Sequence, residues 1–398
     1  MIDIPLNIQK TNVNDFLEFI WDRFSKEIGP VACQHFYIET GDPQVYIYDV
    51  NWAHRSLPFS ARMQFYNHTN KGIYRVVLDV TYESTSINSN HEKAIADIIK
   101  GANKIDLRTV MNAGRIYFPV RSKYHFGCDY FFPESNLGIS SINGVLYFYF
   151  SVEYISKSQL DMYILERVKL TCAIFTLVTQ HLFEYEPNNK IYYTDIDNNI
   201  TKENLFIDKN SFVDADEIIK HDKLYLPHEA NKIISAIIRD DKCKNSALRF
   251  AESIKLRHEV EHDRIHNSFK IQYELLGYVS AIESLLDTTE KTITVTCDNC
   301  GTPIDKPQRK ITNKFNDFVK KHSLNKKSVM TAMKDLYNDR SKFVHMGESL
   351  TKSNTMGSKP LLLEGKSYNI GFPYYYLNVH EFTGYLLRSS MSQSNINP

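Results

Sequence analysis

The chain has 398 residues, of which 42% are apolar and 24% are charged. This is a globular composition, and it excludes a disordered, collagen-like or coiled-coil chain. The length predicts two domains, because single hydrophobic cores rarely grow beyond about 250–300 residues. Lys and Arg together number 47 and Asp and Glu number 47, so the net charge alone does not indicate a nucleic-acid partner.

Three features of the sequence predict a cytoplasmic protein. The N-terminus, MIDIPLNIQK, has no basic segment followed by an apolar run, so no secretory signal is expected. The most apolar stretch, residues 170–183, is too short for a membrane span. Six cysteines, only two of them closely spaced, do not form the framework of a disulfide-rich secreted protein.

The N-terminal half is rich in strand signals. Residues 74–82 and 144–154 are dominated by β-branched and aromatic residues and are bounded by Asn, Ser and Gly. A short helix is predicted at 16–24. Residues 157–184 predict a long helix that is apolar on nearly every side, which is typical of a buried helix. We therefore expect a mixed α/β domain, with a strand-rich sheet and a long buried helix packed on it.

The C-terminal half predicts helices. Apolar residues recur with a spacing near 3.6 from Leu248 to Leu286, which indicates one or two long helices. A loop containing Gly301, Pro303 and Pro307 is expected next. It is followed by helices near 311–322, 326–348 and 378–391, and this order is that of an up-and-down helical bundle.

Between the two halves, residues 184–220 carry nine acidic residues against four lysines and show no sustained period. We place the domain junction there and predict an α+β protein with two domains. Residues 1–215 are expected to form an N-terminal α/β sensor or regulatory domain. Residues 216–398 are expected to form a C-terminal all-α bundle.

The strongest motif lies in residues 337–348, YNDRSKFVHMGE, where four residues separate Arg340 from His345. Upstream, residues 278–286 read YVSAIESLL. Both segments resemble the ApeA-like branch of the HEPN ribonucleases, whose motif is R-x4-6-H, and the resemblance covers roughly residues 226–395. It implies a HEPN-like ribonuclease bundle behind a variable N-terminal domain, and a homodimer. It also implies an anti-phage abortive-infection effector that responds to a phage-derived trigger, with transfer RNA as a candidate substrate.

Arg340 and His345 suit RNA cleavage that requires no metal or other cofactor. A His near its ordinary pKa serves as a base or an acid at neutral pH. An Arg offers a planar, permanently charged fork that matches the oxygens of a phosphate. Attack by the 2′-OH would leave a 2′,3′-cyclic phosphate and a 5′-OH, as the family implies.

The spacing of the motif also constrains its geometry. Residues five apart lie about 140° apart around an α-helix, so Arg340 and His345 do not share a face. Ser341 lies one turn before His345, and its hydroxyl is expected to orient the imidazole. Arg340 follows an apolar stripe and therefore needs a partner, for which Glu283 is the candidate. Tyr337 is a further supporting residue.

The charge around the motif favours an anionic partner. Residues 291–345 hold 12 Lys and Arg against five Asp and Glu. A basic surface beside the motif would attract and position a phosphate backbone. A solvated helix face is the alternative interpretation. The residues expected to bind RNA are Arg309, Lys310, Lys314, Lys320, Lys321 and Lys342.

Cys297 and Cys300 form half of a zinc-knuckle pattern and are the candidate ligands of a structural zinc ion. The remaining ligands would come from Cys243, from a His such as His322, or from a second subunit. Reduced cysteines in a loop are the alternative interpretation.

A second metal pattern is the H-E-x-x-H match between His258 and His262, which is typical of zinc proteases. The charged residues around it instead indicate an exposed helix surface. The sequence therefore leaves three classes of function open. They are a metal-independent endoribonuclease, a non-catalytic RNA- or nucleotide-binding regulatory module, and a zinc hydrolase, in that order of preference.

Overall fold

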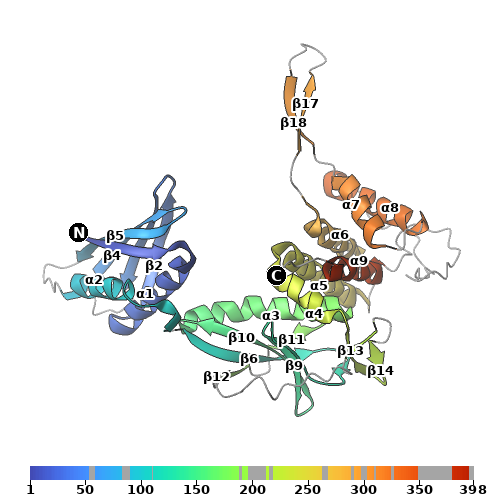
Figure 1. The fold of residues 1–398 in the computed structure, drawn as a ribbon, viewed down its shortest axis with the longest axis horizontal. Helices are drawn as coiled ribbons and strands as arrows, with labels where there is room; N and C mark the ends of the chain where they lie inside the picture. Colours follow the sequence, from blue (N-terminus) through green and yellow to red (C-terminus); the bar gives the residue numbers. More distant parts are fainter. Residues whose placement is uncertain are drawn as a thin grey trace. The chain divides into compact units, whose positions relative to one another are not determined.

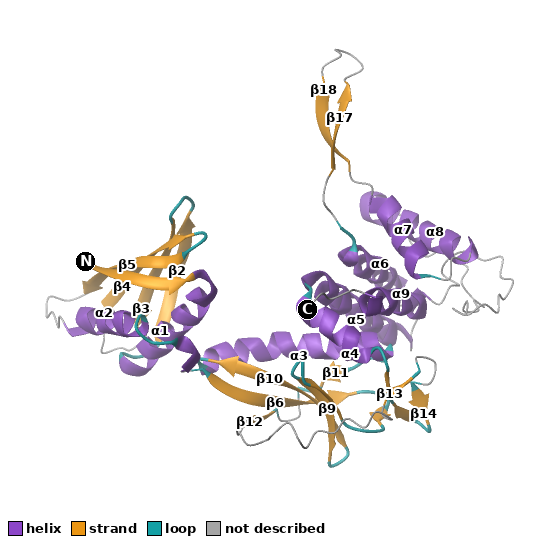
Figure 2. Cartoon of the chain, viewed as in Figure 1, coloured by secondary structure: helices purple, strands orange, loops and turns teal. Residues whose placement is uncertain are grey.

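The chain is a mixed α/β protein with antiparallel sheets in its N-terminal half and helices in its C-terminal half, as the sequence predicts (Figure 1, Figure 2). No described helix is both long enough and apolar enough to cross a membrane. The computed structural model describes residues 1–52, 59–82, 90–109, 111–187, 191–195, 212–214, 218–261, 268–287, 291–296, 303–308, 311–323, 327–347 and 379–393.

The chain divides into two compact units at positions other than the predicted junction. Unit 1 consists of Met1–Gly114 and Val152–Leu165, and unit 2 consists of Arg115–Ser151 and Glu166–Pro398. A shift in composition does not mark these boundaries, because the chain passes between the units inside regular elements. Those elements are strand β6 (Asn112–Arg121), strand β10 (Val145–Tyr154) and helix α3 (Lys157–Thr179).

Unit 1 is built on a five-stranded antiparallel sheet with the order β1-β5-β4-β3-β2. Side chains alternate along each strand between the covered face and the open face. In β4, for example, Phe59, Ala61, Met63 and Phe65 are buried and the residues between them are not. The strands are β1 (Ile2–Gln9), β2 (Val31–Glu39), β3 (Gln44–Trp52), β4 (Phe59–His68) and β5 (Gly72–Tyr82).

Two helices cover one face of this sheet (Figure 1). Helix α1 (Val13–Glu27) includes the predicted short helix and buries Phe16, Phe19, Ile20 and Phe24. Helix α2 (Asn90–Ala102) was not expected from the sequence, and it adds Ile95 and Ile99 to the same core. Short 3₁₀ helices lie at Lys10–Asn12 and Leu107–Thr109.

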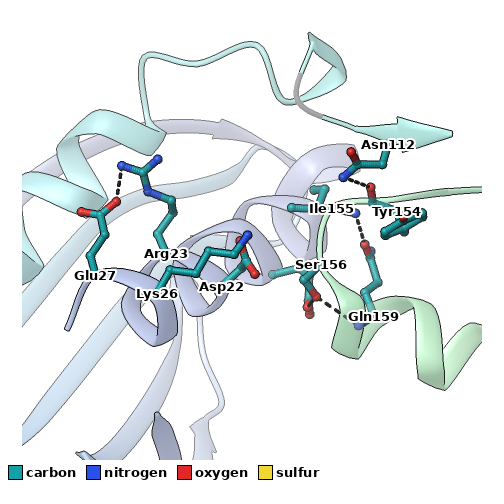
Figure 3. A network of polar contacts seen from close by, with 10 residues as sticks. Asp22, Arg23, Lys26, Glu27, Asn112, Tyr154, Ile155, Ser156 and Gln159 are labelled. Atoms are coloured by element: carbon teal, nitrogen blue, oxygen red, sulfur yellow. Dashed lines mark hydrogen bonds and ion pairs between the residues drawn. The ribbon is translucent and has the colours of Figure 1, made fainter. Parts of the chain in front are cut away.

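Helix α3 begins with a side-chain cap at Ser156 (Figure 3). The backbone N–H of Gln159 donates to Ser156 Oγ at 3.1 Å, and the backbone N–H of Ile155 donates to Gln159 Oε1 at 2.6 Å. Ser156 Oγ also bonds to Glu18 of α1. The first of these bonds satisfies a backbone donor that the start of a helix leaves without a partner. Together the bonds fix the first turn of α3 within unit 1.

The sheet of unit 2 has the order β11-β6-β10-β9-β8, with β12 paired to β6. The sequence predicts that the whole helix is buried, but only the C-terminal part of α3 is, since Leu165 is 66% exposed. In the buried part, Phe175 packs on Phe148 of β10 with 4.5 Å between ring centroids. The further strands of this sheet are β8 (Tyr130–Phe132), β9 (Leu137–Ile142), β11 (Glu184–Tyr185) and β12 (Tyr192–Asp195). A small three-stranded sheet has the order β14-β15-β7, and its strands are β14 (Ile219–Lys220), β15 (Lys223–Leu224) and β7 (His125–Phe126). A separate pair consists of β13 (Phe212–Val213) and β16 (Leu226–Pro227).

The helices of unit 2 agree with the predicted helices of the C-terminal half. One difference is a two-stranded hairpin, β17 (Lys291–Thr296) and β18 (Pro303–Gln308), where the sequence predicts a loop. α5 and α6 approach closely at Gly277, where an added Cβ would lie 2.0 Å from Ser253 Oγ. The helices are α4 (Ala230–Arg239), α5 (Asp241–Glu261), α6 (Ser268–Leu285), α7 (Ile311–His322), α8 (Lys327–Met346) and α9 (Val379–Gln393).

Candidate functional site

Arg340 of α8 and Glu283 of α6 form an ion pair, with 2.8 Å between a terminal guanidinium nitrogen and Glu283 Oε2. The contact that the sequence predicts between these two residues is thus confirmed. Their side chains are 22% and 17% exposed, so the pair lies near the surface and keeps access to solvent. The Nε atom of Arg340 is buried and has no hydrogen-bond partner among the described residues.

Tyr337 completes a three-residue cluster around the same carboxylate. Its hydroxyl donates to Glu283 Oε1 at 3.3 Å, so the two carboxylate oxygens each accept one hydrogen bond from α8. The Tyr337 ring packs on Phe315 of α7 with 4.6 Å between centroids. Burial raises the pKa of Tyr337, and the nearby charge of Glu283 raises it further. The hydroxyl therefore keeps its proton and remains a donor to Glu283.

Apolar packing places α8 against α6. Met333 and Leu336 of α8 and Val279 and Ile282 of α6 are buried. These residues belong to the two apolar stripes that the sequence predicts on α8 and α6, but the α8 stripe does not continue to Val344, which is 49% exposed. The packing of the two stripes explains why Arg340 and Glu283 meet. The Phe315 contact shows that α7 also supports the cluster. Sequence reasoning missed this role, although the buried pair Phe315 and Val319 follows a helical spacing.

His345 lies in the last turn of α8 and is exposed to solvent. Its neighbours Val344 and Met346 are 49% and 72% exposed, so the end of α8 presents apolar side chains beside the imidazole. The helix ends at Met346, and the next residue, Gly347, has a φ of 70° and donates its N–H to Phe343 O at 3.0 Å. Glycine is the residue that adopts this left-handed conformation with the least strain.

A single copy of the chain does not bring His345 into the Arg340 cluster. The two residues lie about 140° apart around the helix axis. The predicted contact between Ser341 and His345 is not made either, since the structure records no hydrogen bond between these two described residues. Ser341 is half-buried, whereas His345 is exposed.

The residues expected to bind RNA differ in their surroundings. Lys320 and Lys321 are exposed in the last turn of α7 and form no ion pair within the described part of the chain. Lys314 donates to the backbone oxygen of Asp287, and Lys342 lies 3.8 Å from Asp339. Arg309 and Lys310 lie outside the described residues.

The predicted metal ligands do not meet in the described part of the chain. Cys297, Cys300 and His262 lie outside it, and its remaining His, Cys, Asp and Glu side chains form no group of three that could hold a metal ion. Cys243 is buried in α5, and burial raises its pKa to about 12, so its thiol is protonated at neutral pH.

Helix α8 carries two groups of known chemistry, a guanidinium, which donates hydrogen bonds to anions, and an imidazole, which can take up or release a proton. A guanidinium has five N–H donors, and the hydrogen bond to Glu283 uses one of them. An exposed imidazole in a helix end is accessible to a large ligand. Comparison of the chain with protein-family models, curated proteins and solved structures finds no match.

Proposed function

We propose that the protein is a metal-independent endoribonuclease of the HEPN type, with Arg340 and His345 as its catalytic residues. The observation that carries the proposal is the fixed position of Arg340, which bonds to Glu283 near the surface on the helix that carries His345 in its last turn. Tyr337 bonds to the other oxygen of the same carboxylate. A positioned cation of this kind stabilises the charge that develops on a phosphate during cleavage.

In the proposed reaction, His345 takes the proton from the 2′-OH of the RNA and the 2′-oxygen attacks the adjacent phosphorus. The bond from phosphorus to the 5′-oxygen breaks, and that oxygen receives a proton from the imidazolium of His345, either the one formed in the first step or that of the second copy. Arg340 binds the phosphate oxygens as the negative charge increases. The products are a 2′,3′-cyclic phosphate and a 5′-OH.

A homodimer is part of the proposal. Arg340 and His345 lie on different sides of α8, so a site that uses both is more easily formed where two copies of α8 meet around a two-fold axis. The exposed Val344 and Met346 supply apolar contact area at that end of the helix. The resemblance to ApeA-like proteins also leads us to propose a cytoplasmic anti-phage role, in which the N-terminal part responds to a phage-derived trigger.

The proposal is tested by incubating the full-length protein with transfer RNA and with total RNA in EDTA, and by mapping the new ends. We expect cyclic phosphate and 5′-OH ends with the wild type and no cleavage with His345→Ala. Cleavage that EDTA abolishes would instead indicate the zinc hydrolase.

A non-catalytic RNA- or nucleotide-binding module is the alternative. It is favoured by the Glu283 contact, because an Arg already paired with a carboxylate also serves a purely structural role. This alternative predicts saturable RNA binding that weakens with salt, and no cleavage under any condition.

A further inference from the structure

Strand β2 forms an open edge of the unit 1 sheet. It is the last strand in the sheet order and, among the described strands, pairs only with β3. Residues 32–39 are all exposed. An edge strand presents a row of unpaired backbone N–H and C=O groups, which folded proteins usually protect with prolines, inward charges or a covering segment. β2 contains no proline, and its one irregularity lies between Cys33 and His35.

One row of β2 side chains faces the side of the sheet that α1 covers. Tyr48 of β3 contacts Trp21 of α1, with 5.5 Å between ring centroids, so Tyr48 points to that side. The register pairs Phe36 with Tyr48, and cross-strand partners share a face. Tyr37 is paired with Ile47 and lies on the opposite face. The row on the α1 side consists of Val31, Cys33, Phe36 and Ile38.

A cavity of about 470 Å³ lies between α1 and this row. Its volume falls within the range of ligand pockets, roughly 300–1,000 Å³. Two aromatic rings, Trp21 and Tyr48, contribute to the wall, and Asp22 is its one charged residue. Asp22 and Ser156 are both seen in Figure 3. The lining residues are Trp21, Asp22, Ser25, Val31, Cys33, Tyr48 and Ser156.

We propose that this groove, the cavity together with the α1-facing row of β2, binds an extended segment of a partner protein. The segment adds to β2 as a sixth strand and places a Lys or Arg side chain in the cavity. Backbone hydrogen bonds along an open edge supply affinity in this mode of recognition, and a pocket for one side chain supplies specificity. The backbone of β2 and the cavity beside it provide these two parts.

The charges favour a cationic side chain. The faces of Trp and Tyr attract cations, and an aliphatic stem packs against the apolar wall. Asp22 is the one carboxyl side chain in the lining, and its contact with Lys26 at 2.7 Å is an i,i+4 pair with an exposed lysine. Pairs of this kind on a helix surface are weak and exchange readily. Unit 1 carries 12 Lys and Arg against 15 Asp and Glu, which complements a basic segment.

The exposed apolar area favours a short segment over a second copy of this chain. Phe36 and Ile38 are 52% and 45% exposed, which corresponds to an apolar area on the order of 200 Å². A stable protein–protein interface needs about 800 Å² on each partner. An extended segment requires less, because most of its affinity comes from the backbone.

The test selects peptides of twelve random residues on the full-length protein and measures their affinity by tryptophan fluorescence, because Trp21 lines the cavity. We expect enriched peptides with one fixed Lys or Arg among alternating β-branched residues. Asp22→Asn removes the charge that attracts the cation, and it should weaken peptide binding about fivefold. Phe36→Lys places a charge on the edge strand, and it should weaken peptide binding about tenfold or more. Tyr37→Lys, on the opposite face of the same strand, is the matched control and should change the affinity less than about twofold.

The proposal is overturned if no peptide is enriched, or if Asp22→Asn and Phe36→Lys leave the affinity unchanged. A wild-type dimer that Phe36→Lys dissociates would also overturn it, since the occupant would then be a second copy. Thermal unfolding verifies that each variant folds, and Ile38→Lys replaces Phe36→Lys if that variant does not. The readout is binding, so a failed nuclease test leaves this inference unaffected.

Discussion

Glu283 and Arg340 are 57 residues apart in the sequence, and their side chains meet at 2.8 Å between α6 and α8. Replacing Glu283 by Ala would leave the guanidinium half-buried and without its carboxylate. Because the pair retains some solvent exposure, we expect a decrease of about 1–3 kcal/mol in the free energy of unfolding, below the full cost of breaking a buried pair. Denaturant unfolding measures it.

The matched control for that variant is Asp339→Asn, which removes the partner of the exposed Lys342 on the same helix. We expect a change of about 0–1 kcal/mol, as for other surface pairs. If the two variants lower the free energy of unfolding equally, the Glu283 contact stabilises α8 no more than a surface ion pair does.

The end of α8 depends on Gly347. An added Cβ meets no atom within 4 Å there, so Gly347→Ala tests backbone strain alone. The residue has a φ of 70°, and placing an Ala in this region costs about 1–2 kcal/mol. We predict that the variant lowers the melting temperature, or frays the last turn and reduces the amide protection of His345 in hydrogen exchange. An unchanged melting temperature and unchanged protection would contradict this account of the helix end.

Unit 2 should lose stability on mild acidification. Burial lowers the pKa of His181 to about 4, and the charges of Lys123 and His258 lower it further. Burial also lowers the pKa of His380 to about 3, and the charges of Arg257 and His258 contribute. Below a pH of about 6.5 the unfolded chain binds protons that the folded chain excludes, so stability falls as the pH decreases from there.

Thermal unfolding at pH 7.5, 6 and 5 checks this prediction. The melting temperature of the wild type should fall across this range, and His181→Gln combined with His380→Gln should flatten the dependence. If the melting temperature of the double variant depends on pH as strongly as that of the wild type, groups other than His181 and His380 cause the loss of stability.

The sequence predicts the C-terminal helices well because their apolar spacing is long and regular. The same spacing places Arg340 beside the apolar stripe of α8 and Glu283 in the apolar stripe of α6, and this is why their contact could be predicted. Sequence reasoning missed α2, whose residues lie in a half dominated by strand signals. It also missed the β17–β18 hairpin, because Pro303 and Pro307 favour a loop. A two-stranded hairpin tolerates prolines, since both of its strands are edges.

Other features require the fold itself. The unit boundaries lie inside β6, β10 and α3, where no linker composition signals them. The groove beside β2 depends on sheet order and strand register, which pair Phe36 with Tyr48 and bring β2 beside Trp21. Neither order nor register follows from the pattern of a single strand.

RNA binding should depend on the two exposed lysines of α7. On single-stranded RNA, each lysine that neutralises a phosphate contributes about 0.7 to the slope of log affinity against log salt. We therefore expect Lys320→Ala with Lys321→Ala to reduce that slope by about 1.4. Lys232→Ala, an exposed lysine on α4, serves as the control and should leave the slope unchanged. If the double variant keeps the wild-type slope, Lys320 and Lys321 are not part of the RNA-binding surface.

The proposed chemistry is tested most directly by the rate of RNA cleavage in EDTA at saturating RNA, compared between His345→Ala and Asn338→Ala. Both residues are exposed on α8, so both variants should keep the stability of the wild type. We predict that His345→Ala lowers the rate by about 10²–10⁴-fold, the usual contribution of an acid–base group, and that Asn338→Ala retains it. Cleavage by His345→Ala at the wild-type rate would contradict the assignment of the catalytic residue.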